Sequence, residues 1–209
     1  MSKVSDQTNQ THSPLFLGID AGTSGIRACL IDEQAKPIAE VSRPLPPATI
    51  ADDQVSQSPQ TWAAVLDEVL KELADKVSLQ NLQAIAIDGT SGSVFFADAK
   101  GQPTSEALMY NDARSQAQVK QLQTLTDNTV VQSVSAGLPK LMWLNEQNST
   151  DARYAMHQAD YLGFLLTDKL GHSDAVSYTH LRAHETKTRI AGGGVGVKSG
   201  GGGGGGGGG

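Results

Sequence analysis

A glycine-rich turn between two apolar segments is the feature that most constrains the fold of this chain. The segment Leu15–Asp32 reads LFLGIDAGTSGIRACLID, in which two runs rich in Leu and Ile flank Gly22 and Gly25. Glycines at a sharp turn between apolar runs predict a β-hairpin. Such a turn exposes successive backbone N–H groups that attract an anion, and the hydroxyls of Thr23 and Ser24 add to them.

Two charged residues flank this turn. Asp20 ends the first predicted strand, and Arg27 lies early in the second. A carboxylate at that point is placed to hold Mg²⁺ through water, because Mg²⁺ binds few carboxylates and keeps much of its hydration shell. With Arg27 as a fixed positive charge, the hairpin predicts a cradle for nucleotide phosphates and Mg²⁺. An ordinary hairpin turn explains the same residues equally well, since Asp, Gly and Ser are common in turns for local reasons.

The remaining pattern predicts an α/β domain in which a three-stranded meander is followed by alternating helices and strands. Strands are expected at 15–20, 26–31 and 37–43, and residues 44–58 are expected to form a loop. Ser58 and Pro59 then begin a helix, with Ser as the cap and Pro at the first helical position. Its apolar residues recur every three or four positions, which indicates one buried face.

The second half of the pattern begins with a strongly apolar strand at 82–87. Its composition is typical of a central strand covered on both faces. The segment Asp88-Gly-Thr-Ser-Gly92 closes it. Further strands are expected at 93–97 and 107–111, and helices at 113–125, 138–144 and 160–170.

Composition excludes several classes of function. The chain has a net charge of −6, which argues against nonspecific binding to nucleic acid and to anionic membranes. Cys29 is the only cysteine, and residues 1–14 form a polar arm with no apolar core of a signal peptide. No apolar run has the length of a membrane span. We therefore expect a cytoplasmic protein with a disordered arm at residues 1–14.

The C-terminal segment, residues 176–209, is expected to be foreign to the domain. Residues 176–186 resemble one reading frame of a DNA sequencing adapter, and the chain ends in a run of glycine. A flexible glycine-rich linker is the alternative. We exclude this segment from the fold and take residues 15–174 as the domain.

Four motifs follow one another along the chain. They are Gly18-Ile-Asp-Ala-Gly-Thr-Ser-Gly25, Ile87-Asp-Gly-Thr-Ser-Gly92, Tyr110-Asn-Asp-Ala-Arg114 and Leu138-Pro-Lys-Leu-Met-Trp-Leu144. One such motif alone would be weak, but the four in this order resemble those of the FGGY family of carbohydrate kinases. The resemblance extends from about residue 15 to residue 174, the N-terminal half of a family member. The resemblance implies the N-terminal domain alone of an actin/hexokinase-like ATPase fold, which is of the ribonuclease-H type.

The resemblance also assigns residues to ATP, Mg²⁺ and a sugar. It implies that Asp20, Gly22, Thr23 and Ser24 lie at the phosphates of Mg-ATP, with Arg27 as a further candidate and Asp20 as the metal ligand. Phosphoryl transfer depends on positioning and charge neutralisation, which these residue types supply. The positions that it implies for the sugar are Thr90, Ser91, Asn111 and Asp112.

Several of these residues have a second interpretation. Asp112 could cap the following helix instead of accepting sugar hydroxyls. Asp88 is as well explained by strand-end hydrogen bonding as by function. We expect Tyr110 to be a packing wall and Trp143 to belong to the core, and Arg114 could pair with a neighbouring acid.

The resemblance narrows the substrate to a ketopentose. Xylulose kinases of the family typically carry Gly-Gln-Met-His-Gly where this chain has Gly89-Thr-Ser-Gly-Ser93. The form found here resembles that of ribulose kinases, so we expect D-ribulose before D-xylulose, phosphorylated at the terminal primary hydroxyl.

The general base of the family, an aspartate in a later glycine-rich motif, has no counterpart here, and the resemblance leaves the catalytic residue unknown. We therefore expect the chain alone to be inactive. A non-catalytic nucleotide- or sugar-binding module of actin-like fold is the alternative, and a homodimer is left open.

Overall fold

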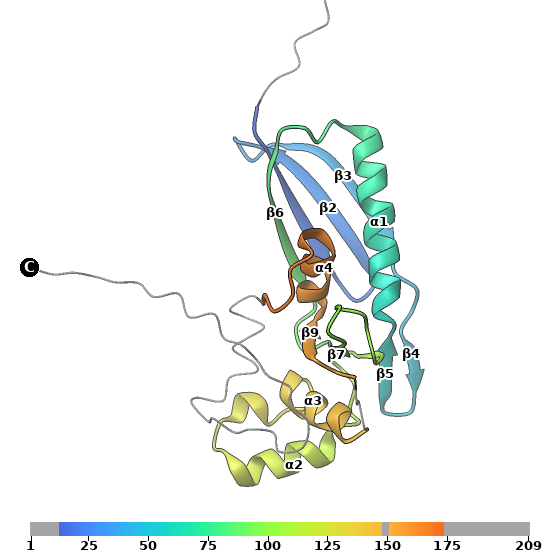
Figure 1. Cartoon of the computed structure of the whole chain (residues 1–209), viewed down its shortest axis with the longest axis vertical. Coiled ribbons are helices and arrows are strands. Elements are labelled where there is room, and N and C mark those ends of the chain that lie inside the picture. The colour runs from blue at the N-terminus through green and yellow to red at the C-terminus, as the bar shows by residue number, and fades with distance from the viewer. Residues whose placement is uncertain (1–12, 148–150, 174–209) are drawn as a thin grey trace, which may run out of the picture.

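The structure is a computed structural model that describes residues 13–147 and 151–173. The expected arm at 1–14 and segment at 176–209 therefore lie, apart from residues 13 and 14, outside the described residues. Within the described ranges the chain forms two sheets, with the long helix α1 beside the first and the helices α2 and α3 at the opposite end of the molecule (Figure 1).

The first sheet contains the predicted hairpin. Strands β1 (Leu15–Ala21) and β2 (Gly25–Asp32) are antiparallel, and β3 (Pro37–Pro44) extends the meander as expected. Strand β6 (Leu82–Gly89) lies parallel to β1 on its other side, which makes the order β3-β2-β1-β6. The meander needs only short turns, whereas the parallel pair needs the crossover that α1 supplies.

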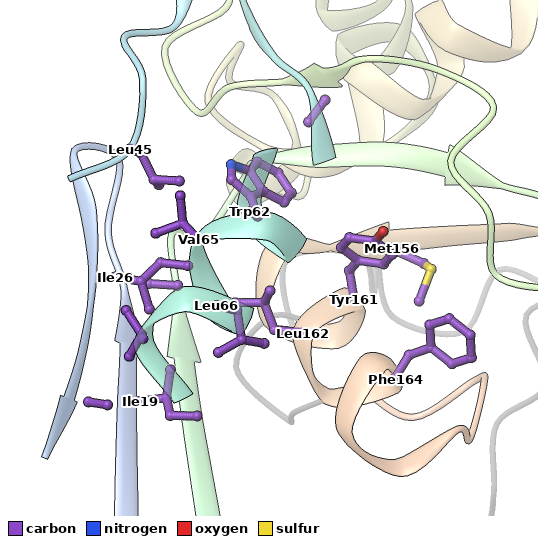
Figure 2. Close-up of a cluster of buried hydrophobic side chains, with 14 of the residues drawn as sticks. Ile19, Ile26, Leu45, Trp62, Val65, Leu66, Met156, Tyr161, Leu162 and Phe164 are labelled. Atoms are coloured by element: carbon purple, nitrogen blue, oxygen red, sulfur yellow. The ribbon is translucent and has the colours of Figure 1, made fainter. Parts of the chain in front are cut away.

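Helix α1 (Pro59–Lys76) covers one face of this sheet. Its apolar stripe packs against the alternate residues of β1 and β2 that face it, as Figure 2 shows for Leu66, Ile19 and Ile26. Leu73 on the same stripe is fully buried, which stabilises the fold by about 2 kcal/mol. The predicted periodicity of this helix is confirmed.

The second sheet has the order β4-β5-β8-β7-β9. Its strands are β4 (Thr49–Ala51), β5 (Gln54–Gln57), β7 (Val94–Ala97), β8 (Ala107–Leu108) and β9 (Tyr154–His157). Helix α4 (Gln158–Thr167) follows β9 directly. Edge-to-face ring contacts join Trp62 of α1 to Phe95 of β7 at 6.0 Å and Phe95 to Tyr161 of α4 at 5.3 Å, and Figure 2 places Tyr161 in this shared core.

The remaining helices form a small group at one end of the molecule (Figure 1). They are α2 (Gln116–Leu125), the short 3-10 helix η1 (Thr129–Val131) and α3 (Gly137–Glu146), which contact one another. Helices were expected at 113–125 and 138–144, so both are confirmed: α2 begins three residues later and ends as expected, and α3 begins one residue earlier and ends two residues later.

Three expectations about strands differ from the structure. The strand expected at 107–111 is only the two residues of β8. Residues 44–58 are not a loop throughout, because β4 and β5 form a hairpin there whose pairing with β8 is long-range. Strand β6 is not central in the described sheet but lies at its edge, with Ile85 42% exposed. Its apolar composition indicated burial on both faces, whereas the described residues cover it on one side only.

No helix within the described residues is long and apolar enough to cross a membrane. Trp62 is fully buried in the core, and its indole N–H donates to Oε1 of Gln57 at 2.6 Å. Cys29 on β2 is half-buried.

Candidate functional site

Two motif-bearing turns meet at one edge of the first sheet. Strands β1 and β6 are parallel and in register, with Ala21 beside Gly89, so their carboxyl ends coincide. The amide of Thr90 donates to the carbonyl of Ala21 at 3.2 Å. The glycine turn after β1 and the loop after β6, which are far apart in the sequence, therefore lie side by side.

The glycine turn is tightly closed and leaves polar residues exposed. It is closed by a hydrogen bond from Gly22 N to the carbonyl of Gly25 at 3.0 Å. Gly25 is required there, because a Cβ would lie 2.7 Å from the carbonyl oxygen of Arg43. Thr23 and Ser24 are exposed, and within the described residues their amides donate no hydrogen bond. The two N–H groups and two hydroxyls of Thr23 and Ser24 therefore belong to exposed positions of the turn.

Charged residues gather on the sheet face that α1 does not cover. Asp20 is exposed there, in register with Arg27 of β2 and with Asp88 of β6. Neighbouring strands lie about 4.8 Å apart, so the two carboxylates are adjacent. Arg27 forms an exposed ion pair with Glu40 at 3.3 Å. Asp88 Oδ1 accepts from the amide of Gly89 at 2.9 Å, so its strand-end hydrogen bond is present.

This donor set fits hydrated Mg²⁺ beside phosphates. Carboxylate oxygens from Asp20 and Asp88 are hard ligands that leave room for the waters Mg²⁺ retains. The amides of the glycine turn would face the phosphates. Among residues 13–147 and 151–173 there is no group of three or more His, Cys, Asp and Glu side chains that could hold a metal, so a bound ion would depend on water and phosphate ligands.

A pocket of about 450 Å³ opens beside Ser91. Five of its seven lining residues carry hydroxyl groups, which suits a polyol because each hydroxyl both donates and accepts. Sequence reasoning identified Ser91 and expected Tyr110 as a wall, and the other residues come from the segment that contains η1. The lining residues are Ser91, Tyr110, Thr129, Val130, Ser133, Ser135 and Ala136.

The other predicted sugar residues occupy different environments. Thr90 is half-buried, and its hydroxyl donates to the carbonyl of Ala21 at 3.4 Å, while its amide also donates to Oε1 of the buried Gln158 at 2.9 Å. Thr90 therefore fixes the loop after β6 to β1 and α4. Asn111 is exposed directly after Tyr110. Gln158 was not singled out from the sequence, because nothing local distinguishes it.

Asp112 is fully buried and its carboxylate holds protein groups. Its Oδ2 accepts from the amide of Val55 at 2.7 Å and from Nε of Arg114 at 2.9 Å. The guanidinium of Arg114 lies 4.9 Å from the centre of the Trp143 ring, which is half-buried and packs against the smaller buried cluster around Leu144. The structure therefore does not place Asp112 where a sugar could reach it, and Arg114 pairs with an acid as expected.

The arrangement of the two sheets and the glycine turn is that of the actin/hexokinase-like ATPase fold, as in sugar kinases of known structure. A gluconate kinase from Lactobacillus acidophilus superposes with a TM-score of 0.67 at 20% identity, covering 76% of this chain and 34% of that one. A ligand-bound xylulose kinase from the same organism superposes with a TM-score of 0.66 at 20% identity, covering 75% and 34%. At such identities the likeness shows the fold alone.

The family follows from the sequence match. The model of the FGGY family of carbohydrate kinases, N-terminal domain, matches residues 15–181, so this chain belongs to that family. Xylulose kinase of Escherichia coli is 32% identical over 143 residues, which cover 62% of this chain and 28% of that protein. The chain spans about a third of the length of the curated relatives it matches.

Proposed function

We propose that this domain binds the sugar and the ATP phosphates in an ATP-dependent ketopentose kinase. The observation that carries the proposal is the hydrogen bond from Thr90 N to the carbonyl of Ala21, which joins the glycine turn to the loop that contains Ser91. A sugar in the hydroxyl-lined pocket and a phosphate chain at the glycine turn would thus be held by adjoining loops. Phosphoryl transfer needs mainly this positioning and charge neutralisation.

The residues have distinct roles in this proposal. The amides and hydroxyls of Thr23 and Ser24 bind phosphate oxygens, and Arg27 adds positive charge on the same sheet. Asp20, with Asp88 beside it, would hold Mg²⁺ through water, and that ion would neutralise charge on the transferred phosphoryl group. Ser91 and Asn111 contact sugar hydroxyls, whereas Thr90 and Asp112 support the two loops from inside.

We further propose D-ribulose as the first substrate and D-xylulose as the second, each phosphorylated at the terminal primary hydroxyl. Curated relatives named xylulose kinase support a ketopentose. The residues after β6 support ribulose. Thr90 and Ser91 carry short hydroxyl side chains where xylulose kinases typically carry Gln and Met, and Gly92 stands where they carry His. A short hydroxyl side chain leaves a different volume and donor pattern beside the sugar.

Binding to the purified chain tests the proposal directly. D-ribulose and D-xylulose are titrated separately, with L-arabinose as an aldopentose control, and Mg-AMP-PNP is titrated as the nucleotide. We expect Ser91→Ala to weaken sugar binding by about tenfold and Asp20→Asn to weaken only the magnesium-dependent binding of the nucleotide. Glu33→Gln, at an exposed turn, is the matched control. Absence of ketopentose binding by the folded wild-type chain would contradict the proposal.

Two further expectations belong to the same proposal, and the oligomeric state is left to measurement. A coupled ADP assay is expected to detect no sugar phosphorylation by this chain alone, since among the described residues no carboxylate lines the sugar pocket as a general base. The protein is proposed to be cytoplasmic. Sedimentation of the purified chain would distinguish a monomer from a homodimer.

A further inference from the structure

Lys140 of α3 is a buried cation beside the sugar pocket. Its side chain is fully buried, and its Nζ donates to the carbonyl of Gly92 at 3.0 Å and to the carbonyl of Tyr110 at 2.9 Å. Lysine is almost never fully buried, because an ammonium group loses its hydration unless hydrogen bonds replace it. A methionine would fill the same space without a charge. The two hydrogen bonds are therefore what a lysine adds at this position.

Both carbonyls belong to loops that carry candidate sugar residues. Gly92 directly follows Ser91, and the carbonyl of Tyr110 lies in the peptide plane that it shares with the amide of Asn111. The two loops are also joined by a hydrogen bond from the amide of Tyr110 to Oγ of the buried Ser93 at 3.2 Å. Fixing these carbonyls therefore fixes the direction in which both loops present their side chains.

The pocket is lined by the loop of Ser91, by Tyr110 and by the segment before α3. This third segment meets the loop of Ser91 at Gly92. This residue has φ +76°, and a Cβ on it would lie 2.3 Å from the carbonyl oxygen of Ser135. Ser135 lies just before α3, the helix that carries Lys140. The ammonium group thus lies at the junction of all three chain segments that line the pocket.

We propose that Lys140 is a positioning residue for sugar binding, which holds the Gly92 and Tyr110 loops at the separation that a bound ketopentose requires. This inference rests on the proposed function, because it needs the sugar to occupy the pocket beside Ser91. Lys140 acts through the loops and does not touch the sugar.

The test separates sugar binding from nucleotide binding. Lys140→Met removes the donors and keeps an unbranched side chain of similar bulk, whereas Lys140→Arg keeps both charge and donors. Lys120→Met, at an exposed position of α2, is the matched control. D-ribulose, D-xylulose and Mg-AMP-PNP are titrated against each purified chain, and amide hydrogen exchange is followed at Ser91 and Asn111.

We expect Lys140→Met to weaken ketopentose binding by about tenfold or more while leaving the affinity for Mg-AMP-PNP unchanged. Exchange at Ser91 and Asn111 should accelerate by a similar factor. Lys140→Arg should recover part of the sugar affinity, and Lys120→Met should match the wild type. Should Lys140→Met fail to fold, Lys140→Gln serves instead, because its side chain is one atom shorter than that of lysine and its single amide group cannot replace both hydrogen bonds of Nζ.

Two results would overturn the inference alone. One is unchanged sugar affinity in the folded Lys140 variant, and the other is an equal loss of sugar and nucleotide affinity, which a merely structural role would produce. No ketopentose binding by the wild-type chain would overturn the proposed function and this inference together. That outcome is recognised before any variant is compared.

Discussion

Lys140 should make the stability of this domain rise with pH. Burial lowers the pKa of its ammonium group from 10.5 to about 8, and the charge of Asp112 opposes only part of that effect. In the unfolded chain the same group regains its ordinary pKa. Between pH 8 and 10.5 the unfolded chain therefore holds a proton that the folded protein has released. Unfolding takes up this proton, so the free energy of unfolding increases as the pH rises.

The size of the effect follows from the shift of the pKa. Between pH 8 and 10.5, each pH unit adds about 1.4 kcal/mol to the free energy of unfolding for one proton. Between pH 7 and pH 9.5 the wild type should gain about 2 kcal/mol relative to Lys140→Met, in which no group titrates at this position. Below pH 7 the difference should be constant, because the group is then protonated in both states.

Urea unfolding at several pH values between 6 and 9.5 measures this difference. Comparison of the two proteins at each pH removes the contribution of groups that titrate in both, such as Tyr161, whose pKa burial raises. Lys120→Met retains Lys140 and should show the same rise as the wild type. A wild-type minus Lys140→Met difference that stays flat across this range would refute the reasoning, since it would mean that the ammonium group is not desolvated by the fold.

Three other substitutions test separate parts of the structure. Leu73→Ala empties a fully buried site beneath the sheet and should lower the free energy of unfolding by about 2–5 kcal/mol in urea titration, with no change in ligand affinity per folded molecule. Gly92→Ala should weaken ketopentose binding and lower the melting temperature, because φ is +76° and the added Cβ would meet the carbonyl of Ser135. Arg114→Met should destabilise the domain by about 3 kcal/mol at neutral pH, because it removes the guanidinium that forms an ion pair with the buried carboxylate of Asp112. Smaller losses, or an unchanged midpoint in calorimetry, would count against each assignment in turn.

Local patterns predicted the elements whose sequence signal is strong. The hairpin around Gly22 and Gly25 is confirmed because a tight turn between apolar runs is specified by neighbouring residues. Helix α1 is confirmed because its buried stripe recurs with helical spacing. The strands β4 and β5 were missed, since they are only three and four residues long, and they exist through pairing with each other and, for β5, with β8.

The candidate site was predictable in part. Motif residues at Asp20, Thr23, Ser24 and Ser91 are exposed where the sequence placed them. Burial was not predictable for Asp112, because nothing in Tyr110-Asn-Asp-Ala-Arg114 reveals that the carboxylate turns inward to the amide of Val55.

The sequence by itself determined the local conformations and the chemical types available, since turn formation, helix periodicity and the supply of hydroxyls and carboxylates depend on residues near one another in the chain. Only the tertiary structure decided which of them act together. The parallel pairing of β1 with β6 brings the two glycine-containing turns to one edge of the sheet. Helix α3 places Lys140 where its Nζ donates to the carbonyls of Gly92 and Tyr110, in the loops that contain Ser91 and Asn111. These are contacts between residues distant in sequence, and packing of the whole core selects them rather than any local preference.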